Sequence, residues 1–370
     1  MLRLFLPIFL FYAMFETNSS ADETPIKAYN IDYNWDSPDK YINSFAAPGK
    51  WADANPKELM KWYEDLGCNT VHSFGVSCNG YAWYKGGKIP PQPNLKYDLL
   101  TEMVKIGREK NIRVFAYFCV GANTKWGLEN PEQSYGTPSE PHIPFTLQYI
   151  EYLSESIKEA IKIARPHGIM LDWIWTPAGN SLNKKPKPLK WLDCERQMYY
   201  ELTGKKFPGK EHISESEEAR FRRLSIARLW KSVYKTIKNA DPDCLIWITN
   251  ENVNSPDVAN SEMFSQADWL MNEHGDISKT RAMHKMVKPE ARLITCLAAW
   301  NKSNPYETAK DALKNGIGLY GFAKPSDGFL RKPVSYYLNS DITTLHDDEL
   351  NIAVLARIFN GKELKNPIGQ

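Results

Sequence analysis

The sequence predicts a single α/β domain, a (β/α)8 (TIM) barrel, on the strength of three observations. Eight short apolar segments, each ended by polar residues, alternate with longer segments of helical periodicity. Strict alternation of this kind is typical of a parallel sheet that closes on itself, with helices outside. The chain has 370 residues, of which 42% are hydrophobic, so it is long enough for one barrel and excludes disorder. An open, doubly wound sheet stays as the alternative, because the order of strands cannot be read from sequence.

The predicted strands share a short run of apolar or β-branched residues. They cover residues 28–33, 70–74, 113–120, 168–175, 244–249, 267–271, 292–297 and 316–322.

The predicted helices repeat apolar residues every three to four positions. The first covers residues 56–66, with Pro56 in its first turn and Gly67 as its stop. The others cover residues 99–110, 145–164, 217–239, 278–287 and 306–314, with a closing helix around 347–359.

A long stretch at residues 177–214 interrupts this rhythm after the fourth strand. We expect a loop, because stretches of this length usually serve as a lid or a binding wall. Its basic run at 184–188 favours a solvated surface over a ligand site.

The first residues resemble a secretory signal rather than part of the fold. Arg3 precedes an apolar run over residues 4–15, which is too short to cross a bilayer but suits the core of a signal peptide. Small residues at Ser19 and Ala21 favour cleavage after Ala21, with an uncleaved anchor as the alternative. We therefore expect residues 1–21 to be a signal peptide and 22–370 a secreted or periplasmic barrel domain without stable membrane insertion.

Charge and cysteine content exclude several classes of protein. The formal net charge is only +2, which argues against a nucleic-acid partner. The six cysteines have no framework spacing, so we expect buried thiols for most of them. Neither a metal-ligand motif nor a Gly-rich phosphate loop occurs, so we predict no metal and no cofactor. The oligomeric state is left open.

Polar and aromatic residues gather where the predicted strands end, which is the face that carries the chemistry in such barrels. Three carboxylates are candidates for catalysis: Asp172, Glu273 and Glu251. Candidates for substrate binding are Asp32, Trp35, His72, Tyr117, Asn123, Trp173, Trp175, Asn250, Asn272, His274, Trp300 and Lys324.

Carboxylates surrounded by Trp, Tyr, Asn and His suit sugar chemistry. Aromatic faces stack on sugar rings, polar side chains bind hydroxyls, and glycoside cleavage uses two carboxyl groups. The sequence therefore predicts a glycoside hydrolase with a carbohydrate substrate. A secreted carbohydrate-binding barrel without catalysis is the alternative, and a sugar-acid lyase or isomerase is a third reading.

Several segments resemble the α-L-fucosidases of glycoside hydrolase family 29, in order and spacing over about residues 50–250. These are residues 67–81 (GCNTVHSFGVSCNGY), the helix 149–163 followed by GIMLD at 168–172, and DPDCLIWITN at 241–250. The chain departs from the family at Ser77-Cys78, where fucosidases have a His-His pair, and at Asn250-Glu251, where they have Asn-Arg. It also lacks their C-terminal β-sandwich, so the sugar is left open.

The resemblance implies a retaining mechanism with Asp172 as the nucleophile. Glu273 is our choice of acid/base, because a nucleophile on the fourth strand and an acid on the sixth is also the arrangement of α-galactosidase-type barrels. Glu251 is the reserve candidate.

Overall fold

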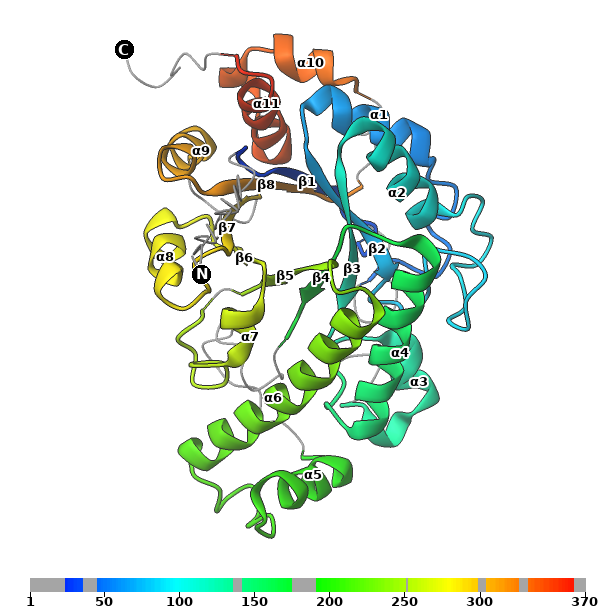
Figure 1. The fold of residues 1–370 in the computed structure, drawn as a ribbon, viewed down its shortest axis with the longest axis vertical. Coiled ribbons are helices and arrows are strands. Elements are labelled where there is room, and N and C mark those ends of the chain that lie inside the picture. The colour runs from blue at the N-terminus through cyan, green and yellow to red at the C-terminus, as the bar shows by residue number, and fades with distance from the viewer. Residues whose placement is uncertain are drawn as a thin grey trace, which may run out of the picture.

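The computed structural model of the chain describes residues 24–35, 45–135, 142–174, 191–250, 252–298, 304–325 and 332–362. Eight parallel strands pair in chain order and close into a barrel, with helices around its outside (Figure 1). This closure confirms the (β/α)8 prediction and excludes the open sheet. The strands are β1 Lys27–Ile31, β2 Thr70–Val76, β3 Arg113–Cys119, β4 Gly168–Asp172, β5 Leu245–Thr249, β6 Trp269–Asn272, β7 Arg292–Leu297 and β8 Gly318–Ala323.

The long helices follow the predicted segments closely. They are α1 Pro56–Leu66, α2 Leu99–Lys110, α4 Leu147–Ala164, α6 Glu215–Ala240, α9 Pro305–Lys314 and α11 Asp347–Phe359. Helix α8 (Ile277–Ala282) is shorter than predicted and continues as a 3₁₀ turn, Met283–Lys285. Short elements that the periodicity did not predict are α3 Thr124–Glu129, α7 Glu262–Gln266, α10 Val334–Asn339, and the 3₁₀ turns Pro131–Gln133 and Ile342–Thr344.

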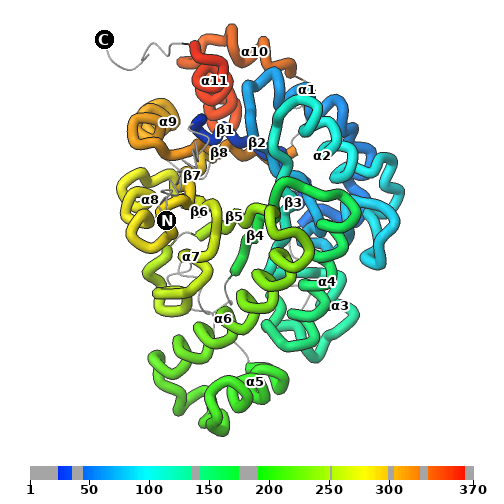
Figure 2. The backbone as a smooth tube through the Cα atoms, viewed as in Figure 1, coloured from blue at the N-terminus to red at the C-terminus, as the bar shows by residue number. Residues whose placement is uncertain are grey.

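The prediction of a continuous loop at 177–214 is wrong in its second half. Helix α5 (Asp193–Thr203) lies there and packs against α6 below the barrel in the view of Figure 2. Its N-terminus is stabilised by the Glu195 carboxylate, which accepts a hydrogen bond from the Leu192 amide at 3.0 Å. Trp191, at the start of this segment, packs its ring on Phe207 and Phe221, at centroid distances of 4.4 and 5.2 Å. These contacts join residues distant in the chain, so local periodicity does not reveal them.

Large aromatic side chains fill the middle of the barrel. The ring of Phe115 on β3 lies 4.6 Å from Trp269 on β6 and 5.4 Å from Trp247 on β5, centroid to centroid. All three residues are buried. Because strand residues alternate between the two faces of a sheet, the next inward side chains on β3 and β6 are Tyr117 and Met271. This aromatic layer therefore forms a solid floor that fills the barrel below the carboxyl ends of its strands.

The cysteines are free thiols and most are buried, as the sequence predicts. All six cysteines lie in the described ranges, none is in a disulfide, and five of them are buried. Across the described residues, none of the helices is both long and apolar enough to cross a membrane.

Candidate active site

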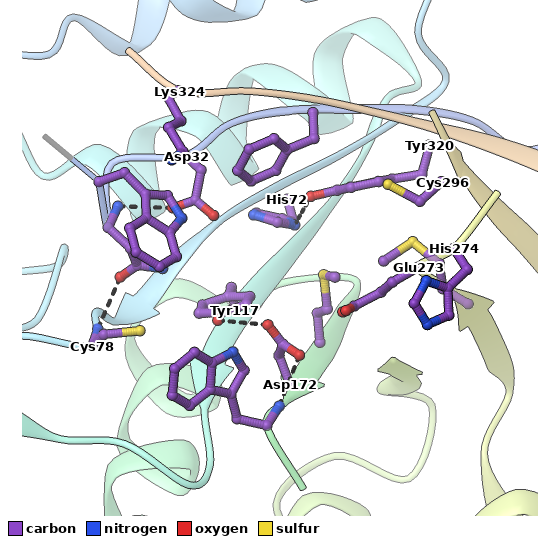
Figure 3. A pocket seen from close by; sticks show the side chains of 16 residues that line it. Asp32, His72, Cys78, Tyr117, Asp172, Glu273, His274, Cys296, Tyr320 and Lys324 are labelled. Carbon is purple, nitrogen blue, oxygen red and sulfur yellow. Dashed lines mark hydrogen bonds between the residues drawn. The ribbon is translucent and has the colours of Figure 1, made fainter. Parts of the chain in front are cut away.

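A cavity of about 500 Å³ opens at the carboxyl ends of the strands, above the aromatic floor. Figure 3 shows the side chains that line it. They come from all strands except β5 and from the residues that follow them: Asp32, Asn34, Trp35, His72, Cys78, Tyr117, Met170, Asp172, Trp173, Met271, Glu273, His274, Cys296, Tyr320, Phe322 and Lys324.

Asp172, the last residue of β4, is held by three hydrogen-bond donors. The Thr249 hydroxyl donates to Oδ1 at 2.5 Å, the Trp173 amide donates to Oδ1 at 2.8 Å, and the Tyr117 hydroxyl donates to Oδ2 at 2.9 Å. Burial raises the pKa of Asp172, while these bonds oppose the rise because they favour the ionised form. The carboxylate is therefore fixed in position and aimed into the cavity.

Strand β4 ends at Asp172, three residues earlier than predicted, because of the backbone of Trp173. Trp173 has φ +57°, in the left-handed region that non-glycine residues rarely adopt. This conformation interrupts the strand and brings the Trp173 amide onto the Asp172 carboxylate. Such strain, of about 1–3 kcal/mol, is typical of functional sites.

Glu273 follows β6 directly and points across the cavity toward Asp172 (Figure 3). Both side chains line the cavity, and Glu273 is among the groups that lower the pKa of Asp172 against the larger effect of burial, which raises it. Two carboxyl groups that face one another in a desolvated cavity favour holding one proton between them, because two negative charges at short range repel.

A third carboxyl group, Asp32, lies just beyond the end of β1. It is buried, and its Oδ1 accepts a hydrogen bond from the Asn34 amide at 2.8 Å. Burial, with a smaller contribution from the Asp172 charge, raises the pKa of Asp32 to about 7, although Lys324 opposes the rise. The Lys324 ammonium lies 5.0 Å from the centre of the Trp35 ring. This side of the cavity therefore offers both charged and aromatic contacts.

His72 on β2 stacks between two tyrosines. Its ring centroid lies 5.2 Å from that of Tyr117 and 5.7 Å from that of Tyr320. Burial lowers the pKa of His72 to about 3, so the imidazole is neutral at physiological pH.

Aromatic side chains continue along the rim. Phe45 packs between Trp35 and Trp173, at centroid distances of 5.5 and 5.9 Å, and His142 stacks on Trp173 at 5.2 Å. Trp35 and Trp173 line the cavity itself. Two indole rings therefore form part of the cavity wall.

The structure brings most of the predicted site residues together. Nine of the fifteen line the cavity: Asp32, Trp35, His72, Tyr117, Asp172, Trp173, Glu273, His274 and Lys324. Trp175, Glu251 and Trp300 lie outside the described residues, so their roles stay predictions.

Three predicted asparagines do not line the cavity, and the side chain of each accepts a hydrogen bond from a backbone amide instead. The Asn123 Oδ1 accepts from the Trp126 amide and caps α3, at 2.9 Å. The Oδ1 atoms of Asn250 and Asn272 accept from the amides of Asn252 and His274, at 2.9 and 2.8 Å. Asn favours such turns and caps, so its position at a strand end is weak evidence of ligand binding.

Seven lining residues were not among the predicted site residues: Asn34, Cys78, Met170, Met271, Cys296, Tyr320 and Phe322. Period-2 alternation could have found several of them. Met170 and Met271 precede Asp172 and Glu273 by two positions, and Tyr320 and Phe322 precede Lys324 by four and two.

Metal ligation has no support in the part of the chain that the structure describes. No group of three or more His, Cys, Asp or Glu side chains there could hold a metal ion.

Comparisons with known proteins agree with the barrel. The sequence model of a family described as hypothetical glycosyl hydrolase 6 matches residues 55–173, from the start of α1 to the residue after Asp172. No curated protein matches the sequence.

Solved structures of similar fold are glycoside hydrolases of several specificities. α-L-Fucosidase isoenzyme 2 from Paenibacillus thiaminolyticus has a TM-score of 0.61 and 14% identity, over 90% of this chain and 49% of that one. The PgaB (BpsB) glycoside hydrolase domain from Bordetella bronchiseptica has a TM-score of 0.55 and 13% identity, over 85% of this chain and 97% of that one. A β-galactosidase from Bacillus circulans sp. alkalophilus has a TM-score of 0.54 and 13% identity, over 92% of this chain and 56% of that one.

The chain spans about half the length of that fucosidase. At these identities the likeness concerns the fold: the protein has a glycoside hydrolase-like barrel, and membership of glycoside hydrolase family 29 is not established.

Proposed function

We propose that the protein is a retaining glycoside hydrolase in which Asp172 is the nucleophile and Glu273 the acid/base. The observation that supports this most strongly is the pair of carboxyl groups at the ends of β4 and β6, which face one another in a cavity with aromatic walls. The two groups stand at the ends of β4 and β6, which are separated only by β5, so the fold itself brings them together.

The proposed reaction uses the protonation state of the pair. Asp172, ionised and held by three donors, attacks the anomeric carbon, while Glu273 gives its proton to the leaving oxygen. Glu273, now ionised, removes a proton from water, which attacks the glycosyl–Asp172 ester and releases the sugar. Asp172 leaves as a carboxylate, and Glu273 regains its proton, so the cycle closes.

The proximity of the carboxyl groups favours retention. Retaining enzymes hold the pair about 5–5.5 Å apart, whereas inverting enzymes need about 6.5–9.5 Å to admit a water molecule. Glu273 lies near enough to Asp172 to lower its pKa, and this proximity favours the shorter separation.

The same pair argues against a binding protein without catalysis. Placing two carboxyl groups together in a desolvated site costs free energy. A sugar-binding site needs hydroxyl acceptors and aromatic faces, which Asp32, Trp35 and Trp173 supply without that cost.

α-L-Fucosides are the first sugars to test. The resemblance at residues 67–81 and 168–172 and the fold likeness to an α-L-fucosidase both favour them. Export through the apolar leader at residues 4–15 belongs to the same proposal, because it would bring the enzyme to glycans outside the cytoplasm.

The test is a panel of aryl α- and β-glycosides, α-L-fucoside included, assayed with wild type and Asp172→Asn. We expect wild type to release the aryl alcohol from at least one sugar and Asp172→Asn to lose at least ~10³-fold in kcat, because the amide cannot form the ester intermediate. Asp311→Asn, on the exposed face of α9, is the matched control and should keep full activity. Asp172→Asn with near-wild-type activity would remove Asp172 from the mechanism.

A further inference from the structure

The side chains of Tyr320 and His72 contact each other inside the barrel, a contact that the sequence did not predict. The Tyr320 hydroxyl lies 3.3 Å from Nδ1 of His72. Both residues are buried to at least 97%, and both line the cavity. They lie on β8 and β2, which flank β1, and are therefore held by rigid elements.

The direction of this hydrogen bond follows from the chemistry of the two groups. A phenol is a better donor than acceptor, and a neutral imidazole has one strong acceptor nitrogen. Among the described residues, Nδ1 of His72 is the only partner of the Tyr320 hydroxyl. The hydroxyl therefore donates to Nδ1, and the proton of the neutral ring lies on Nε2.

Nε2 of His72 is then a buried donor that lacks an acceptor. It has no hydrogen-bond partner in the described part of the protein. An unsatisfied buried donor costs about 1–3 kcal/mol, so such a group normally meets water or a ligand. In Figure 3 the ring of His72 lies between the Tyr320 hydroxyl and the Asp32 side of the cavity.

We propose that Tyr320 fixes His72 as a neutral Nε2–H donor that binds an oxygen of the sugar in the cavity. His72 is then a specificity-determining residue, and Tyr320 is its positioning residue. The proposal rests on the proposed function for the identity of the ligand, and it adds that the bound sugar must present an acceptor oxygen toward β1 and β2. A sugar without that oxygen would leave the donor unsatisfied.

The first test reads the tautomer directly and needs no turnover. Nitrogen NMR of ¹⁵N-histidine-labelled protein at neutral pH distinguishes protonated from unprotonated ring nitrogens, and His72→Gln assigns the His72 signals among the seven histidines. We expect the proton on Nε2 and a hydrogen-bonded Nδ1. In Tyr320→Phe, the Nδ1 signal should move to that of a nitrogen accepting no hydrogen bond. Tyr200→Phe, on the exposed face of α5, should leave it unchanged.

The second test uses monodeoxy analogues of the aryl glycoside that the enzyme cleaves. For one position, removal of the hydroxyl should lower kcat/KM about 10- to 100-fold in wild type. His72→Asn has no group at the Nε2 position and should lose this discrimination. His72→Gln places its amide near that position and should keep more of it.

Two results would overturn the proposal: a proton on Nδ1 in wild type, or equal deoxy discrimination in wild type and His72→Asn. Thermal unfolding of each variant shows whether it folds. If the His72 variants do not fold, the NMR comparison of wild type with Tyr320→Phe is sufficient by itself. An enzyme inactive on every glycoside would contradict the proposed function, while the tautomer would still be measured.

Discussion

At the scale of the residue, the proposed mechanism depends on the carboxyl groups of Asp172 and Glu273. Three hydrogen-bond donors favour the ionised form of Asp172 against the effect of burial, so Asp172 is the proposed nucleophile and Glu273 the proposed acid. The different surroundings of two similar side chains thus assign their roles.

The acid role of Glu273 predicts a dependence on the leaving group. In Glu273→Gln, kcat/KM should fall about 10²- to 10⁴-fold for aryl glycosides with poor leaving groups, because these need a proton as the bond breaks. Activated nitrophenyl glycosides should lose far less, since their phenolate leaves unaided. A plot of log kcat/KM against leaving-group pKa measures this, with Glu262→Gln at the exposed start of α7 as control. An equal loss for all leaving groups would assign the acid to another residue.

Asp32 is a site residue that we expect to lower the stability of the folded protein. Its pKa is raised from 3.8 to about 7 by burial, so the folded state disfavours its ionised form. Stability should therefore fall as pH rises from about 4 to about 7, with the full penalty above that range.

Asp32→Asn cannot ionise and should be more stable than wild type by about 1–3 kcal/mol above pH 7, with no difference below pH 4. Urea unfolding at both pH values measures this, and the variant should lose activity if Asp32 binds the sugar. A variant less stable than wild type at high pH would mean that the charge of Asp32 is well satisfied in the folded protein.

Sequence alone predicted the carboxyl pair and seven other residues of the cavity lining, but not the contacts between them. Asp172 and Glu273 were found because each ends an apolar strand. Tyr320 was missed because it lies inside a strand, where an aromatic residue indicates packing as readily as binding. The Tyr320–His72 contact joins residues 248 positions apart, and no local pattern contains it.

At the scale of the element, the boundary of α4 matters because β4 and Asp172 follow it directly. Arg165, its C-terminal cap, is exposed and has φ +51°, a conformation that favours glycine. Arg165→Gly should therefore stabilise the protein by about 0.5–1 kcal/mol. Arg220→Gly, in the exposed interior of α6, should destabilise it by about 1 kcal/mol. Chemical denaturation compares the two, and a loss of stability in both would show that the side chain of Arg165 contributes more than its strain costs.

Elements with their own end signals were predicted best. Helix α1 runs over the predicted residues because Pro56 begins it and Gly67, at φ +86°, ends it. Helix α5 was missed because its buried side is completed by Phe207 and Phe221, which follow it in the chain. Strand β4 was predicted too long because the apolar run continues through Trp173 and Ile174, and only the backbone turn at Trp173 shows the end.

At the scale of the whole molecule, eight repeats of strand and helix predicted the barrel, and closure then explains the site. Residues from β1, β2, β3, β4, β6, β7 and β8 reach one cavity because the carboxyl ends of parallel strands meet at one rim. The sugar could not be predicted, since barrels of one fold cleave different glycosides. It depends on side-chain placement around the cavity rather than on the strand pattern.

The stereochemistry of hydrolysis tests the central claim most directly. Proton NMR, recorded during the first minutes of cleavage of the preferred aryl glycoside, identifies the anomer released before it equilibrates in water. A retaining enzyme with Asp172 as nucleophile and Glu273 as acid/base should first release the sugar with the anomeric configuration of the substrate. The opposite anomer as first product would contradict retention, because it would require the two carboxyl groups to hold a water molecule between them and would leave no place for a glycosyl–Asp172 ester.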